Sequence, residues 1–176
     1  MRFETTRLKD VRIIELEPAR DERGHFARTF CAREFTAAGL ESLYMQHSFS
    51  HTARTGTVRG MHFQRAPHAE VKLIRCVAGA ILDVLIDIRP GSPTYMQWEA
   101  YELSAGDCRQ LYAPQGFAHG FQTLAPATEV AYVISAFYAP GSAAGIRHDD
   151  PAFNIPWPLP VTEISVKDRS WPDFAA

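Results

Sequence analysis

Residues 71–88 read VKLIRCVAGAILDVLIDI and hold the strongest strand pattern in the chain. Two runs rich in Val, Ile and Leu flank Gly79, an arrangement typical of two strands joined by a tight hairpin. Similar pairs of runs recur at 97–112 and at 119–137. Short strands at intervals of about ten residues are typical of an all-β sandwich or barrel. The pattern therefore predicts three hairpins.

The segments before and after these strands are predicted to contain only one short helix. Residues 11–16 predict a first strand, 21–24 (DERG) a turn, and 31–40 (CAREFTAAGL) a short helix that ends at Gly39. The tail from residue 140 onward carries six prolines and two of the three tryptophans, so we expect irregular structure held by those rings. With no linker or repeat, residues 1–176 are predicted to form a single domain. We expect an antiparallel β-sandwich of jelly-roll type with a few short helices.

Composition excludes several classes of protein. The chain has 176 residues, of which 46% are hydrophobic, and its formal net charge is −2 without a basic run. Proteins that bind nucleic acid through phosphates usually carry a basic stripe, so we expect no nucleic-acid partner. No apolar stretch is long enough to span a bilayer and no secretory signal is visible, so we expect no membrane association. Three cysteines without a CxxC spacing indicate reduced thiols and a cytoplasmic location.

Polar residues interrupt three of the predicted strands. Lys72, Asp83 and Tyr132 each lie within a run of strong strand formers. Because alternate side chains of a strand face opposite ways, any one of these residues could simply lie on the solvent-facing side of its strand. Together they favour a sandwich with a polar, ligand-binding interior.

Two histidines occupy unusual positions. Arg59 and His62 share the predicted strand RGMHFQ (59–64), where strict alternation would send them to opposite faces. A bulge at Gly60 would turn both the same way. His119 follows a Pro- and Gly-rich turn at the start of another predicted strand. The other five histidines lie in loop-like surroundings and are assigned to the surface.

These motifs form an ordered series along the chain. It comprises residues 21–26 (DERGHF), 59–64 (RGMHFQ), 72–79 (KLIRCVAG), 83–89 (DVLIDIR), 114–121 (PQGFAHGF), 138–140 (YAP), 149–151 (DDP), 155–158 (IPWP) and 165–168 (SVKD). The series resembles the dTDP-4-dehydrorhamnose 3,5-epimerase family of sugar-nucleotide epimerases over nearly the whole chain. The resemblance implies a jelly-roll cupin, usually a homodimer that exchanges N-terminal strands, without a metal or organic cofactor.

The resemblance also implies the reaction. The substrate class is a nucleoside-diphosphate 4-keto-6-deoxyhexose, inverted at C3 and C5 or at C3 alone; the family converts dTDP-4-dehydro-6-deoxyglucose to dTDP-4-dehydrorhamnose for polysaccharide synthesis. A hydrogen beside a ketone is acidic, and its inversion needs a base, an acid on the opposite face and a cation at the enolate oxygen. By the resemblance His62 is the base with Asp168 as its partner. Tyr132 is the proton donor, and Lys72 offsets the enolate charge.

The remaining candidate residues are matched to substrate contacts. Asp83 and His119 correspond to a second polar pair near the sugar. Those matched to the nucleotide, the diphosphate or the substrate cleft are Arg23, Phe26, Gln46, Arg59 and Tyr138. Two departures leave the nucleotide base open, since Arg28 stands where the family commonly has glutamate and Ser48 where it has asparagine. Either base recognition is relaxed, or Arg28 turns to solvent or to the diphosphate and thymine is still preferred.

Other functions remain to be weighed. A metal-dependent cupin such as a dioxygenase usually needs an H-x-H pair, and Gln64 stands in the place of the second histidine, so we expect no metal. A non-catalytic sugar-nucleotide-binding cupin is disfavoured because the His, Tyr, Lys and Asp are all present. A C3-only epimerase or a keto-isomerase acting on a related sugar nucleotide stays open, because one-centre and two-centre inversion use the same His and Tyr.

Overall fold

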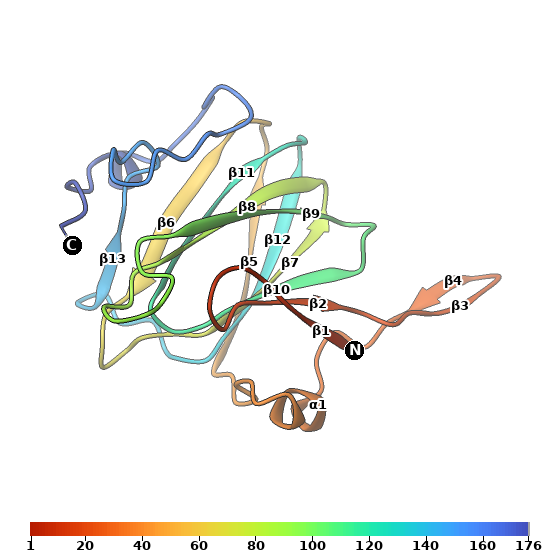
Figure 1. Ribbon diagram of the computed structural model, residues 1–176. Helices are drawn as coiled ribbons and strands as arrows, with labels where there is room; N and C mark the ends of the chain where they lie inside the picture. Colours follow the sequence, from red (N-terminus) through yellow and green to blue (C-terminus); the bar gives the residue numbers. More distant parts are fainter. Residues whose placement is uncertain (176) are drawn as a thin grey trace.

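The computed structural model describes residues 1–175, which form two antiparallel sheets packed as a sandwich (Figure 1). The six-stranded sheet has the order β1 (Arg2–Thr5), β2 (Arg12–Glu15), β10 (Arg109–Ala113), β7 (Lys72–Ala78), β12 (Thr128–Ile134) and β5 (Gln46–Thr52). The five-stranded sheet has the order β13 (Ala143–Gly145), β6 (Val58–Gln64), β11 (Phe117–Thr123), β8 (Ala80–Asp87) and β9 (Trp98–Ser104). The predicted all-β sandwich is therefore confirmed.

The three predicted hairpins are wrong. The strands β7 and β8 do flank Gly79, but β7 pairs with β10 and β12, whereas β8 pairs with β9 and β11. The pairs β9–β10 and β11–β12 likewise divide between the two sheets. At Gly79 the backbone has a φ of +73°, and a side chain there would collide with Thr128, so the position requires glycine. The turn between the two strands is as short as a hairpin turn. It nevertheless leads from one sheet into the other.

The elements predicted outside these strands are largely confirmed. The first strand is β2, and the predicted helix is α1 (Ala32–Ala37), which buries Phe35. The tail is mostly irregular, and the Trp157 indole N–H donates to the His148 carbonyl oxygen at 2.8 Å. It also contains β13 and a one-turn helix, α2 (Val166–Arg169), that the sequence analysis missed. The Ser165 side chain caps α2 by accepting from the Asp168 amide at 3.0 Å.

The space between the sheets is apolar at its centre. Ile74 from β7, Leu85 from β8, Leu111 from β10, Phe121 from β11 and Val130 from β12 are almost fully buried there and pack in one cluster. Burying a side chain of this size stabilises the fold by roughly 1.5–3 kcal/mol. This cluster fixes the two sheets against each other and so supports the polar residues that project from the same strands.

Two features face outward. A hairpin of β3 (Ala19–Asp21) and β4 (Gly24–Phe26) extends away from the sandwich, and all of its strand residues are exposed (Figure 1). Strand β5 forms one edge of the six-stranded sheet and exposes 71% of Phe49. Within residues 1–175, no helix has the length and apolar character needed to cross a membrane.

Candidate active site

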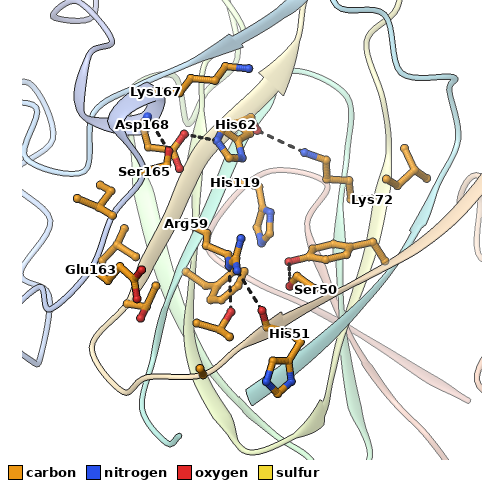
Figure 2. A pocket seen from close by; sticks show the side chains of 18 residues that line it. Ser50, His51, Arg59, His62, Lys72, His119, Glu163, Ser165, Lys167 and Asp168 are labelled. Atoms are coloured by element: carbon orange, nitrogen blue, oxygen red, sulfur yellow. Dashed lines mark hydrogen bonds and ion pairs between the residues drawn. The ribbon is translucent and has the colours of Figure 1, made fainter. Parts of the chain in front are cut away.

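A cavity of about 750 Å³ opens between the sheets and is walled by β5, β6, β7, β11, β12 and residues 163–168 (Figure 2). Six of the residues predicted to form the site line it, namely Arg59, His62, Lys72, His119, Tyr132 and Asp168. A seventh, Asp83, is fully buried and bonded to His119. The structure therefore brings together residues that lie up to 109 positions apart in the sequence.

His62 and Asp168 form a hydrogen-bonded pair. His62 Nε2 lies 2.7 Å from Asp168 Oδ1 (Figure 2). The Gly60 amide donates to Asp168 Oδ2 at 3.2 Å. Burial raises the pKa of Asp168, but the hydrogen bond and charge of His62 outweigh it and bring that pKa below its usual range. An ionised Asp168 holds His62 Nε2 as a donor, so Nδ1 is the ring nitrogen left to accept a proton.

A bulge at Gly60 turns Arg59 and His62 to the same side. On β11, His119 lies opposite His62 and Phe121 lies opposite Arg59, so the register shifts by one residue between the two pairs. Gly60 has a φ of +113°, and a Cβ there would lie 2.6 Å from the Gly120 Cα. Only glycine fits this close approach. The predicted bulge is confirmed, and both side chains reach the cavity.

Tyr132 and His62 reach the cavity from different sheets. Tyr132 projects from β12, in the six-stranded sheet, and His62 from β6, in the five-stranded sheet. Burial raises the pKa of Tyr132 well above the usual value for tyrosine, so its hydroxyl keeps its proton. Its oxygen lies 3.3 Å from Ser50 Oγ. A proton acceptor and a proton donor thus face the same space from opposite walls.

Lys72 is held at the cavity wall by two acceptors. Its Nζ lies 2.9 Å from Glu70 Oε1 and 3.4 Å from the His62 carbonyl oxygen. An ammonium has three N–H donors, so one remains for a ligand. Gln64, which occupies the place of a metal-binding histidine, instead donates to Glu70 Oε2 at 2.7 Å and accepts from the Ala139 amide at 2.6 Å. Sequence analysis did not find Glu70.

The second polar pair lies deeper in the sandwich. His119 Nε2 is 2.8 Å from Asp83 Oδ2. Burial raises the pKa of Asp83 even though the neighbouring His119 pulls it the other way. Among the described residues, the Asp83 carboxyl group makes a side-chain hydrogen bond only to this ring, and its Oδ1 has no hydrogen-bond partner. The contact fixes the orientation of His119 at the cavity.

Arg59 and Lys167 are two further cations in the lining of the cavity. The Arg59 Nε donates to Thr52 Oγ1 at 2.9 Å, and its Nη2 donates to the His51 carbonyl oxygen at 3.0 Å. Lys167 lies 5.5 Å above the Trp171 ring and also lines the cavity. A fixed guanidinium and a second cation suit the binding of a diphosphate. Sequence analysis missed Lys167, although it directly precedes Asp168 in the SVKD motif.

Four predicted substrate-binding residues do not line the cavity. Arg23 lies at the tip of the β3–β4 hairpin, where its side chain is 89% exposed and contacts Asp21, and Phe26 on the same hairpin is 75% exposed. Gln46 and Tyr138 contact each other, with the Tyr138 amide donating to Gln46 Oε1 at 2.7 Å. The hairpin points away from the sandwich, so the structure does not bring Arg23 and Phe26 to the cavity of their own chain (Figure 1).

The two departures from the family pattern also lie outside the cavity lining. Arg28 is exposed and reaches Glu34 at 3.5 Å, and Ser48 is exposed on β5. The side chain of Arg28 therefore turns to the surface next to α1. Within residues 1–175, no three His, Cys, Asp or Glu side chains are grouped so that they could hold a metal ion.

The sequence and the structure both match known proteins. A family model described as dTDP-4-dehydrorhamnose 3,5-epimerase matches residues 5–176. The chain is 41% identical over 175 residues to the dTDP-4-dehydrorhamnose 3,5-epimerase of Sinorhizobium fredii, covering 99% of this chain and 90% of the relative. It is 42% identical over 173 residues to that of Methanothermobacter thermautotrophicus, covering 97% and 92%.

Solved structures agree with these relatives. The dTDP-4-dehydrorhamnose 3,5-epimerase of Bacillus anthracis with TDP and PPi bound superposes with a TM-score of 0.95 at 39% identity, covering 98% of this chain and 99% of that one. The epimerase of Legionella pneumophila in complex with dTDP-4-keto-L-rhamnose gives 0.89 at 37% identity, covering 95% and 89%. A 3'-monoepimerase of Streptomyces bikiniensis in complex with dTDP-quinovose gives 0.89 at 28% identity, covering 96% and 85%.

Proposed function

The chain belongs to the dTDP-4-dehydrorhamnose 3,5-epimerase family, and we propose that it performs the reaction with His62, Asp168, Tyr132 and Lys72. It is an isomerase that acts on a dTDP-linked 4-keto-6-deoxy sugar and converts dTDP-4-dehydro-6-deoxyglucose to dTDP-4-dehydrorhamnose. Its sandwich is the jelly-roll fold of cupins. We take residues 1–176 as a single domain.

The first step is proton abstraction. His62 Nδ1 removes the hydrogen from the carbon beside the C4 ketone, and the electron pair of the broken C–H bond moves onto the ketone oxygen as an enolate. The ionised Asp168, 2.7 Å from Nε2, stabilises the imidazolium that forms. The remaining N–H of Lys72 offsets the enolate charge, which is the part of the transition state where charge develops.

The second step is reprotonation from the other side. Tyr132 gives its proton to the same carbon on the face opposite His62, the enolate returns to the ketone, and the configuration is inverted. The observation that carries this scheme is the placement of His62 and Tyr132 on different sheets, facing one cavity. Acid, base and cation are all side chains, so we expect turnover without a metal or an organic cofactor.

The nucleotide end of the substrate completes the scheme. Arg59 and Lys167 supply cations for the diphosphate at the cavity. Arg23 and Phe26 stand on a hairpin that projects from the body, so we propose that the protein is a homodimer in which each hairpin reaches the cavity of the other copy. The open edge of β5, with its exposed Phe49, supplies an apolar surface for such a contact.

The test follows the two reacting carbons separately. The protein is incubated in D₂O with dTDP-4-keto-6-deoxyglucose, and deuterium at C3 and at C5 is followed by NMR. We expect deuterium at both carbons of the product. Deuterium at C3 alone would make the protein a monoepimerase, and deuterium at neither carbon would contradict the assigned acid and base.

A further inference from the structure

Strand β5 places two hydroxyl groups on its cavity side. Ser50 and Thr52 lie two residues apart, share a face of the strand and both line the cavity. Each holds one residue of the site, since Thr52 accepts from Arg59 at 2.9 Å and Ser50 Oγ lies 3.3 Å from the Tyr132 oxygen (Figure 2). The contact to Arg59 places a binding residue, whereas the contact to Tyr132 reaches the reacting hydroxyl.

Ser50 is the one hydrogen-bond partner of the Tyr132 hydroxyl within residues 1–175. A tyrosine that has given its proton to carbon becomes a tyrosinate, and an unpartnered charge in a partly buried place is costly. A serine hydroxyl is both a donor and an acceptor. Ser50 can therefore accept from Tyr132 when no substrate is bound, and by rotation of its O–H it can donate to the Tyr132 oxygen while the tyrosine proton passes to the substrate.

We propose that Ser50 is a positioning residue that aims the Tyr132 hydroxyl into the cavity and stabilises its anion by a hydrogen bond. The inference rests on the proposed role of Tyr132 as the acid. In the step itself, the O–H bond of Tyr132 breaks, the new C–H bond forms, and Ser50 keeps its own proton while its O–H turns toward the tyrosinate oxygen.

The contact is not needed to hold the strand. Strand β5 pairs with β12 through seven residue pairs, from Thr128↔Thr52 to Ile134↔Gln46. Ser50 lies opposite Val130 in this register, so its hydroxyl reaches Tyr132 diagonally across the ladder. The loss of one hydroxyl leaves every backbone pair of the ladder in place.

The experiment separates exchange from inversion. Ser50→Ala is assayed in D₂O by NMR, which counts deuterium returned to the unchanged substrate and deuterium in the inverted product. Hydrogen bonds to charged groups are the stronger class, so we expect inversion to fall about tenfold. His62 does not depend on Ser50, so its exchange with the substrate should stay within about twofold and KM should not change. The ratio of exchange to inversion therefore rises about tenfold.

Three further variants control the result. Ser50→Thr keeps the hydroxyl and should restore inversion to within about threefold, while Ser50→Cys keeps the size with a weaker donor and should lie between the two. Ser42→Ala removes a serine hydroxyl that contacts Thr36 at 3.0 Å beyond α1, and should leave both rates unchanged. Unfolding by heat, followed by circular dichroism, checks that each variant folds.

The outcomes distinguish the proposal from its premise. Equal loss of exchange and inversion in Ser50→Ala would assign Ser50 a purely structural role and overturn the proposal. Inversion at the wild-type rate in both Ser50→Ala and Ser50→Cys would also overturn it. Tyr132→Phe tests the premise, because it should lose inversion and keep exchange. If Tyr132→Phe inverts normally, the acid assignment fails; if only Ser50→Ala inverts normally, the acid assignment stands and Ser50 has no part in it.

Discussion

The predicted site residues fall into two groups, one in the cavity and one on the β3–β4 hairpin. The side chains in the cavity are held by hydrogen bonds and ion pairs, whereas those on the hairpin are exposed. In the cavity, His62 is held by Asp168 and Tyr132 by Ser50, each from a distant part of the chain, and Lys72 is held by Glu70. On the hairpin, the one polar side-chain partner of Arg23 within residues 1–175 is Asp21, two residues away, and Phe26 is exposed. One chain therefore brings together the groups that we propose to move protons. In the homodimer we propose, the residues matched to the nucleotide would reach it in the other copy.

The largest effect is expected inside the cavity. His62→Ala removes the proposed base and should lower both deuterium exchange and inversion by at least about 100-fold, the usual scale for loss of a general base. NMR in D₂O measures both rates. His68→Ala is the matched control, because this exposed histidine contacts Ser142 away from the cavity. Exchange at the wild-type rate in His62→Ala would move the base to another residue.

A smaller and different effect is expected from the hairpin. Arg23→Ala should raise KM about tenfold and change kcat less than about twofold, because it removes a binding contact and leaves the proton-transfer groups intact. Mixing Arg23→Ala with His62→Ala chains sharpens the comparison. In a mixed dimer, one cavity has an intact His62 and receives an intact hairpin, so activity at low substrate concentration should return. No recovery after subunit exchange would place Arg23 in its own chain's site or outside any site.

The smallest effect is expected at Arg28. Because the Arg28 side chain contacts Glu34 and does not line the cavity, Arg28→Ala should change dTDP affinity less than about threefold. The wild type should prefer dTDP over UDP, CDP and GDP by more than about tenfold, or ~1.4 kcal/mol. Competition binding measures these affinities. Equal affinity for the four nucleotides would show that the family's base recognition is lost in this chain.

The positions of the strands and of several site residues were predictable from the sequence, but the pairing of the strands was not. Alternating Val, Ile and Leu around Lys72 and Tyr132 located the strands, and Gly60 indicated the bulge that turns Arg59 and His62 together. The pairing of strands was not predictable around Gly79, because a tight turn within a sheet and a tight turn between sheets have the same local chemistry. Only long-range packing decides between them.

The partners of the site residues were also out of reach of local patterns. Ser50 and Tyr132 are 82 positions apart, and nothing in either segment indicates that their oxygens lie 3.3 Å from each other. Helix α2 has four residues, too few for a helical period to be visible, so the placement of Asp168 beside His62 came only from the resemblance. Glu70 carried no signal, since acidic residues before a strand are common in loops.

The short crossings between the sheets limit how the enzyme can move. Gly79 joins β7 to β8, and residues 124–127 join β11 to β12, so the chain itself ties the opposite walls of the cavity together. Because these connections are short, we expect the two walls to stay together and the separation of His62 and Tyr132 to change little during the reaction. The base and acid that we propose would then serve both C3 and C5 from nearly fixed positions. We therefore expect the sugar ring to shift within the cavity between the first inversion and the second, while the nucleotide stays bound.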